Sequence, residues 1–309
     1  MPRRIAVVPA STKAGEETIR ILLQSESKPF VRGVYRDRLK APVEFSSTSN
    51  FEAVNGDVGS GSGLDFTGFD TVFYIPPPTY DDVDQAAWAT QTANNVKTAL
   101  QNAATVKKLL LFSAVGAQYD NSIVIRPNPN SSQGILVINH ISDTILKDVV
   151  PEVSIIRPGY FHQAFAHLLE DAKADPPVIR SWITPMEHKI PMVSVKDVGE
   201  TCANALISES TKPSPYYFKL FGPRNYSSAD IRDAVEEITE RKVDLQLVEK
   251  DQLAGYFGQI IPKSQLQGFV DMTTSVLPDG IMAGEFEYDE NTVRGKVELV
   301  ESLRELYKP

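Results

Sequence analysis

Short apolar runs alternate with amphipathic stretches along the first half of the chain. Five runs have the length and character of buried strands: residues 5–8, 30–35, 69–75, 108–113 and 153–156. Three stretches between them have helical periodicity: residues 18–23, 84–104 and 133–148. Strands that alternate with helices are joined by right-handed crossovers, so we expect an α/β fold with a doubly wound parallel sheet. Ligands of such sheets bind at the carboxyl ends of the strands.

The pattern weakens after residue 160. It predicts strands at residues 190–195 and 216–220, a loop or short strand at 176–182, and helices over the remaining segments: 161–173, 198–206, 229–241, two around 251–272, and 291–307. Asp197 and either Ser227 or Ser228 are expected as helix caps. We expect a doubly wound α/β domain from residues 1–158 that also receives segments near 190–221. Residues 159–309 then form a smaller, mostly helical portion.

Composition narrows the functional class. The chain has 309 residues, 42% of them hydrophobic, which allows a sizeable core. A net charge of −9 without a basic tract argues against nucleic-acid binding. The single cysteine, Cys202, excludes an internal disulfide, and no cluster has metal-ligand spacing. No apolar run has the length of a signal peptide core or membrane helix, so we expect a cytoplasmic protein that binds no membrane; its oligomeric state is open.

The turn after the first strand lies where dinucleotide-binding proteins keep a glycine-rich phosphate loop. The three glycine positions of that loop are occupied by Pro9, Thr12 and Gly15. Gly15 is expected to let the helix pack on the strand, whereas Thr12 puts a β-branched side chain beside the phosphates. Glu16 opposes a bound phosphate, and Lys13 offsets part of that repulsion.

Other candidate cofactor residues follow the strands at the same edge. Arg36 comes directly after the second strand, where an arginine suits the 2′-phosphate of NADP. Pro76, Ser113 and Pro158 stand at the ends of three later strands. With Thr12, Lys13 and Gly15 they form the expected cofactor set. NADP(H) binding and the absence of any cofactor remain open alternatives.

Histidine and tyrosine side chains near these strand ends are the acid–base candidates. His162 follows the turn after the fifth predicted strand, and His140 has Asp143 one helical turn away to orient its imidazole. Tyr119 and Tyr160 also follow strand ends, where a phenol either donates a proton or forms an apolar wall.

Taken together, these segments resemble the NmrA-like family of atypical short-chain dehydrogenases along most of the chain. The resemblance rests on six segments: residues 36–40, 56–57, 69–73, 113–117, 156–161 and 190–198. Residues 133–136 and 156–158 look similar to the fungal ergot-alkaloid reductases of the festuclavine synthase type.

The resemblance implies an NADP-binding Rossmann-like domain and a smaller substrate domain. Members of the family reduce small molecules with NADPH, or bind the cofactor as sensors that regulate a partner. In catalytic short-chain dehydrogenases a Tyr-x-x-x-Lys pair donates the proton, but here its positions hold Ile135 and Asn139. Ergot-type reductases work without the pair because an iminium substrate needs hydride alone.

The missing glycines and the missing Tyr/Lys pair together favour a biosynthetic enzyme of secondary metabolism that converts a small apolar metabolite without net redox change. Cyclisation, isomerisation and dehydration are such reactions, and they depend on acid–base groups in a shaped pocket. Two alternatives remain open. One is an NADPH-dependent reductase of the ergot-alkaloid type, and the other is an NADP-sensing regulatory protein.

Overall fold

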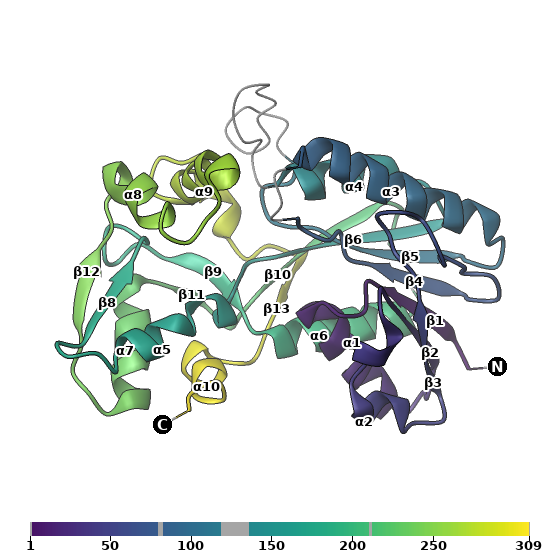
Figure 1. Ribbon diagram of the computed structural model, residues 1–309, viewed down its shortest axis with the longest axis horizontal. Helices are drawn as coiled ribbons and strands as arrows, with labels where there is room; N and C mark the ends of the chain where they lie inside the picture. The colour runs from purple at the N-terminus through teal and green to yellow at the C-terminus, as the bar shows by residue number, and fades with distance from the viewer. Residues whose placement is uncertain (1, 80–82, 119–135, 210–211, 309) are drawn as a thin grey trace. The chain divides into compact units, whose positions relative to one another are not determined.

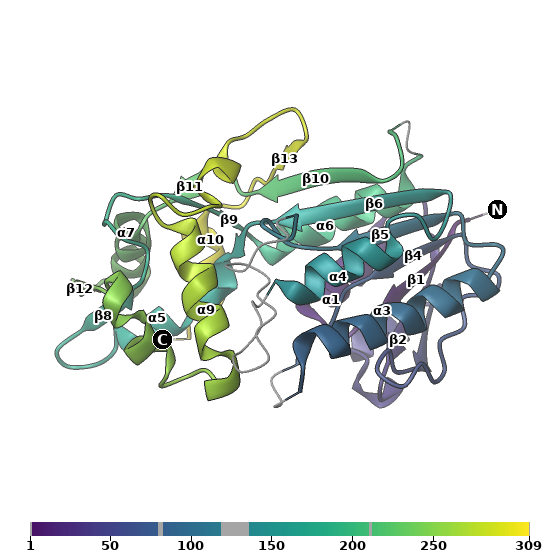
Figure 2. The same cartoon turned by 90° about the horizontal axis from the view of Figure 1, so that it is seen from above.

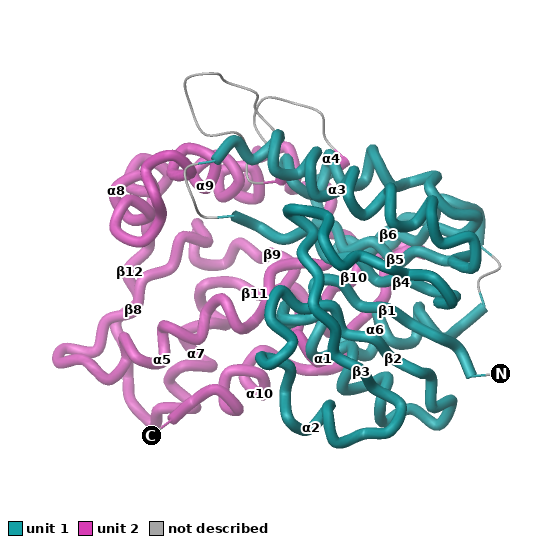
Figure 3. Tube along the Cα trace, turned by 45° about the vertical axis from the view of Figure 1, so that its right-hand side comes forward, with its two compact units in different colours: residues 1–117, 137–157, 198–218 teal, residues 118–136, 158–197, 219–309 magenta. Residues whose placement is uncertain are grey.

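A computed structural model describes residues 2–79, 83–118, 136–209 and 212–308. The chain divides into two compact units, which Figure 3 colours separately. Unit 1 consists of residues 1–117, 137–157 and 198–218, and unit 2 of residues 118–136, 158–197 and 219–309. No helix in the described ranges is long and apolar enough to cross a membrane.

The main sheet has eight strands in the order β13-β10-β6-β5-β4-β1-β2-β3. Their bounds are Arg4–Val8 (β1), Phe30–Tyr35 (β2), Phe51–Asn55 (β3), Thr71–Tyr74 (β4), Lys108–Phe112 (β5), Glu152–Pro158 (β6), Tyr216–Phe221 (β10) and Thr292–Arg294 (β13). Neighbouring strands from β3 to β6 are parallel, as are β10 and β13. The predicted parallel sheet is confirmed. Its order reverses between β1 and β4, which is where doubly wound sheets bind ligands.

Helices cover both faces of this sheet in unit 1. α3 (Gln85–Asn102) and α4 (Val137–Leu146) lie side by side on one face, and α1 (Lys13–Gln24) and α6 (Val195–Ile207) lie on the other, near the short α2 (Val43–Ser46) (Figures 1 and 2). Ala93 and Val96 of α3 pack against strand residues such as Leu109. Small alanines on α3 allow this close approach, and the apolar area that it removes from water stabilises the layer.

Unit 2 contains two small sheets and five helices among its described residues. One sheet joins β11 (Asn225–Tyr226), β9 (Ile190–Val193) and β7 (Tyr160–Phe161), and the other joins β12 (Asp244–Leu247) and β8 (Val178–Ser181). The helices are α5 (His167–Asp171), α7 (Ser228–Thr239), α8 (Leu253–Phe257), α9 (Lys263–Val276) and α10 (Leu299–Arg304). Four 3-10 helices complete the description: Arg38–Lys40, His162–Phe165, Lys250–Gln252 and Ala283–Phe286.

Two expectations about the C-terminal half are corrected. The single helix predicted over residues 291–307 is wrong, because its first part pairs with Lys219–Phe221 as β13 and only α10 remains helical. Asp197 is not a cap: it lies inside α6, and its carboxylate accepts the backbone N–H groups of Lys296 (3.0 Å) and Val297 (3.1 Å). Ser227 does cap α7, as predicted.

Candidate functional site

The loop between β1 and α1 folds tightly onto the first turn of the helix. The Thr12 hydroxyl accepts the backbone N–H of Gly15 at 3.0 Å, which caps α1. A Cβ at Gly15 would lie 3.0 Å from the carbonyl oxygen of Pro9 and 3.1 Å from that of Ala10. The nearest atom to this Cβ would be Thr12 Oγ1 at 2.9 Å, so the crowding at Gly15 comes from the loop itself, rather than from the helix–strand packing that we expected.

This loop also presents unpaired donors. The backbone N–H groups of residues 11–14 have no hydrogen-bond partner among the described residues. The N–H of Ala10 donates to the Val34 carbonyl at 2.9 Å, and that of Glu16 donates to the Thr12 carbonyl at 2.8 Å. Free N–H groups at a helix N-terminus bind anions. Although two glycines are missing, the loop fits a phosphate group.

Glu16 is the acidic group nearest to these donors in sequence. Its side chain is half-buried, and burial raises the pKa of its carboxyl; Arg20 acts in the opposite direction, and Glu44 adds to the rise. Tyr35, the last residue of β2, is buried, and its pKa is raised by burial and by the charge of Glu16. An ionised Glu16 therefore opposes negative charge bound between α1 and the end of β2.

Arg36 follows β2 with an exposed side chain, and Lys13 is exposed at the start of α1. The pKa of Asp57 is lowered although burial raises it, because hydrogen bonds from the backbone of Gly59 and Ser60 and the charge of Arg36 outweigh burial. The Arg36 guanidinium thus acts on the carboxyl end of the neighbouring strand β3, at the edge where the loop after β1 lies.

A buried polar group joins the ends of β5 and β6 to α4. The Ser113 hydroxyl donates to Oδ2 of Asp143 at 2.8 Å, and Arg157 Nη2 lies 3.3 Å from the same oxygen. The Arg157 guanidinium also stacks over the ring of Tyr217, 4.5 Å from its centroid. Burial raises the pKa of the Asp143 carboxyl, and Arg157 and Ser113 act in the opposite direction. Sequence reasoning did not bring these side chains together.

His140 is oriented by a backbone carbonyl. Its Nδ1 lies 2.8 Å from the Ala117 oxygen, which only accepts, so Nδ1 carries a proton and neutral His140 keeps a lone pair on Nε2. The expectation that Asp143 orients this ring is corrected, because the hydrogen bonds of the Asp143 carboxylate go to Ser113 and Arg157. The half-buried imidazole still has the form of a general base.

His162 does not fit the acid–base role expected for it. It is 0% exposed, its Nδ1 bonds to Ser302 Oγ at 2.9 Å, and its ring stands perpendicular to Tyr226 with 5.4 Å between centroids. Burial lowers the pKa of His162 to about 3. The imidazole is therefore neutral near pH 7 and is sealed from ligands by its own unit.

Tyr160 has the character of an apolar wall. Its ring lies 5.4 Å from that of Trp182, and burial raises the pKa of its phenol, which disfavours proton release. Tyr119 lies outside the described residues. Pro76 and Pro158 are both buried. Pro76 is the second residue after the end of β4, and Pro158 is the last residue of β6.

The predicted site residues fall into both units. Those in unit 1 are Thr12, Lys13, Gly15, Arg36, Pro76, Ser113 and His140. Those in unit 2 are Pro158, Tyr160 and His162. Within the described ranges no three His, Cys, Asp or Glu side chains are grouped so that they could hold a metal ion.

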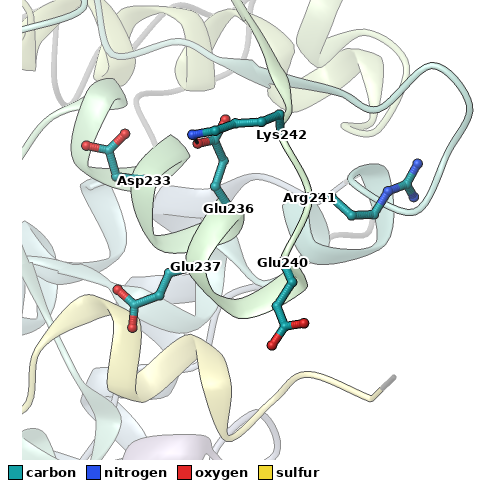
Figure 4. A pocket seen from close by; sticks show the side chains of 6 residues that line it. All are labelled: Asp233, Glu236, Glu237, Glu240, Arg241 and Lys242. Carbon is teal, nitrogen blue, oxygen red and sulfur yellow. Dashed lines mark hydrogen bonds and ion pairs between the residues drawn. The ribbon is translucent and has the colours of Figure 1, made fainter.

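A pocket of ≈ 390 Å³ lies elsewhere, at the end of α7 (Figure 4). Six charged residues line it: Asp233, Glu236, Glu237, Glu240, Arg241 and Lys242. Lys242 lies beside Glu236 in Figure 4 and pairs with it at 2.5 Å, while Glu237 pairs with Arg304. Three of the four acidic side chains are thus in ion pairs, Asp233 with Arg232, Glu236 with Lys242 and Glu237 with Arg304, so we assign the pocket no catalytic role.

Comparison with known proteins shows the fold. No family model matches the chain. A curated relative, the 40 kDa subunit of NADH-ubiquinone oxidoreductase from Neurospora crassa, is 27% identical over 127 residues, which are 40% of this chain and 32% of the relative. The match thus spans about a third of the relative's length.

Three solved structures match nearly the whole chain. Citrobacter triphenylmethane reductase complexed with NADP(H) has a TM-score of 0.75 at 17% identity and covers 98% of this chain and 100% of its own. An Escherichia coli NADPH-dependent quinone oxidoreductase complexed with NADPH has 0.73 at 16%, with coverage of 98% and 100%. The negative transcriptional regulator NmrA with NAD has 0.67 at 15%, with 99% and 92%. The predicted Rossmann-like α/β fold is confirmed.

Proposed function

We propose that the chain is an enzyme that binds NADP(H) and reduces a small, largely apolar molecule. The observation that carries this proposal is the set of N–H groups of residues 11–14 at the N-terminus of α1, beside the switch point of the sheet. These groups have no hydrogen-bond partner in the part of the chain that the structure describes. The likeness in fold to two reductases whose structures contain NADP(H) or NADPH adds support. We further propose that the enzyme works in the cytoplasm.

The residues of unit 1 have distinct binding roles in this proposal. The N–H groups of residues 11–14 hold the pyrophosphate, and the contact of Gly15 with its loop keeps these donors in place. Arg36 takes the 2′-phosphate, and Lys13 adds positive charge at the helix terminus. The bound cofactor supplies a hydride.

Titration of the purified protein with NADPH and NADH, followed by nicotinamide fluorescence, tests the proposal. NADPH binds more tightly, and Arg36→Ala weakens NADPH binding about 10- to 100-fold, since a charge-assisted hydrogen bond is worth about 1.5–3 kcal/mol. NADH binding by this variant stays the same. Arg232→Ala, which removes an arginine of unit 2, serves as the control. No binding at millimolar NADPH refutes the proposal.

The resemblance to ergot-alkaloid reductases suggests one substrate class from secondary metabolism. Asn139 stands at the lysine position of the usual proton-donating pair, and Ile135, at the tyrosine position, lies outside the described residues. An iminium substrate is reduced by hydride alone and does not need that pair.

A redox-neutral reaction is the second candidate. His140 favours it, because its Nδ1 bonds to the Ala117 carbonyl and its Nε2 has no hydrogen-bond partner among the described residues. A base on α4, hydrogen-bonded to the Ala117 carbonyl that follows β5, supports isomerisation, cyclisation or dehydration. The discriminating result is a product formed without NADPH consumption, whose formation His140→Gln abolishes while NADPH binding is unchanged. NADPH consumed in step with the product excludes this candidate.

A further inference from the structure

Ser113 was expected to contact the cofactor, but its hydroxyl bonds to Asp143 in a buried group with Arg157, and the binding roles proposed above do not use this group. It connects three elements of unit 1, because Ser113 follows β5, Asp143 lies on α4 and Arg157 lies in β6. Ser113 and Asp143 are 1% and 6% exposed. These side chains therefore meet at the carboxyl ends of two adjacent strands, the edge at which ligands of such sheets bind.

The ion pair in this group is incomplete. Arg157 contacts the Asp143 carboxylate through Nη2 alone, although arginine and carboxylate usually form two parallel hydrogen bonds. Asp143 Oδ1 and Arg157 Nε are buried and have no hydrogen-bond partner among the described residues. Leaving buried polar atoms unpaired costs stability, so this geometry is poorly explained by a purely structural role.

The surroundings define where a proton can move. Two charged or titratable groups lower the pKa of Asp143, Arg157 of β6 and His140 of α4. The charge of Asp143 in turn raises the pKa of Tyr217 of β10. The Ser113 hydroxyl is the neutral group bonded to the carboxylate, at 2.8 Å. A direct hydrogen bond of this length allows proton exchange between a hydroxyl and a carboxyl.

Building on the proposed NADP(H)-dependent reduction, we propose that Ser113 donates the proton in the reduction of a carbonyl substrate, a ketone or a quinone, and that Asp143 is the positioning residue that returns this proton to Ser113. The substrate gains a hydride from NADPH, which becomes NADP⁺, and a proton from the Ser113 hydroxyl. Asp143 acts in its protonated form: as Ser113 gives its proton to the substrate, the Asp143 carboxyl transfers its own proton to the Ser113 oxygen. The resulting carboxylate, beside Arg157, then takes a proton from solvent. The substrate class thus extends beyond iminium compounds to acceptors that need a proton.

The first test does not depend on turnover. Protein labelled with ¹³C at the aspartate carboxyl carbons is titrated by NMR, and Asp143→Asn identifies the Asp143 signal. We expect Asp143 to titrate above the other aspartates, and Ser113→Ala to move its midpoint further upward, because the lost hydrogen bond favours the ionised form. Ser142→Ala removes a buried hydroxyl of the same helix that has no hydrogen-bond partner among the described residues, and it leaves the midpoint in place.

The second test measures NADPH oxidation with 1,4-naphthoquinone as the probe. Ser113→Ala is expected to lower kcat at least 100-fold while the Kd for NADPH changes less than twofold. Ser113→Thr, which keeps the hydroxyl, restores at least a tenth of kcat. Asp143→Asn lowers kcat, leaves KM unchanged and removes the pH dependence of kcat, whereas a merely structural residue would change KM and stability instead.

The outcomes separate this inference from the proposed function. Absent NADPH binding refutes the proposed function, and the proton-donor proposal falls with it, even if the NMR titration shows the Ser113–Asp143 hydrogen bond. With NADPH bound, full kcat in Ser113→Ala, or no reduction of the quinone by the wild-type protein, overturns the proton donor alone. The proton-donor proposal is also overturned if the titration midpoint of the Asp143 carboxyl is the same in Ser113→Ala as in the wild-type protein.

Discussion

At the scale of single residues, Gly15 shows how one missing side chain shapes the loop after β1. We expect Gly15→Ala to destabilise the protein by about 1–3 kcal/mol, because its Cβ would press on the backbone oxygens of Pro9 and Ala10. Gly255→Ala is the control, since a Cβ there meets no atom within 4 Å and alanine favours a helix. Urea denaturation measures both. Equal stability of the two variants would contradict the tight loop.

His162 predicts a pH dependence of stability. Its pKa is lowered to about 3 in the folded chain, so the unfolded chain binds the proton first as the pH falls below about 6.5. The neutral His162 therefore contributes fully to the free energy of unfolding above pH 6.5, and this contribution is lost as the pH falls toward 3. Between pH 7 and pH 5 it removes about 2 kcal/mol from the free energy of unfolding. Denaturation of His162→Gln at both values should show a correspondingly smaller loss, and an unchanged loss would count against a neutral buried ring.

At the scale of elements, α7 rests on its N-terminal capping box. Ser227 Oγ accepts the backbone N–H of Asp230, and the Asp230 carboxylate accepts that of Ser227. Ser227→Ala should therefore cost about 1 kcal/mol in thermal or urea unfolding. Ser264→Ala, an exposed serine in the first turn of α9, is the matched control and should be nearly neutral. A neutral Ser227→Ala would show that the cap adds nothing to α7.

Elements with strong patterns could be predicted from the sequence, and elements made by distant pairing could not. β2 was predicted at its observed bounds because five of its six residues are apolar or small, all except Arg32, and the charged Arg36 follows them. β13 was predicted as helix, since its three residues become a strand only by pairing with β10. Similarly, the spacing of His140 and Asp143 suggested a contact, but Ser113 and Arg157 from two strands take the carboxylate instead. A one-dimensional pattern does not contain these contacts.

At the scale of the whole molecule, cofactor binding should increase the free energy of unfolding of the protein. A ligand at 100 times its Kd adds about 2.7 kcal/mol to the folded state. Differential scanning fluorimetry with saturating NADPH should therefore raise the melting temperature, and Arg36→Ala should reduce this rise at the same NADPH concentration. NADH at that concentration should raise it less than NADPH. Equal rises for both cofactors would contradict a 2′-phosphate contact.

The positive N-terminus of α1 is part of a chain whose net charge is −9, and this contrast affects the kinetics of anion capture. The net negative charge of the chain repels a multiply charged anion at long range, and the N–H groups at the α1 N-terminus attract it only when it is in contact with them. Salt shortens the reach of the repulsion to about 10 Å at 0.1 M, whereas the short-range hydrogen bonds are screened less. Stopped-flow association of NADPH should therefore become faster as ionic strength rises from a few millimolar, contrary to the usual slowing of oppositely charged partners.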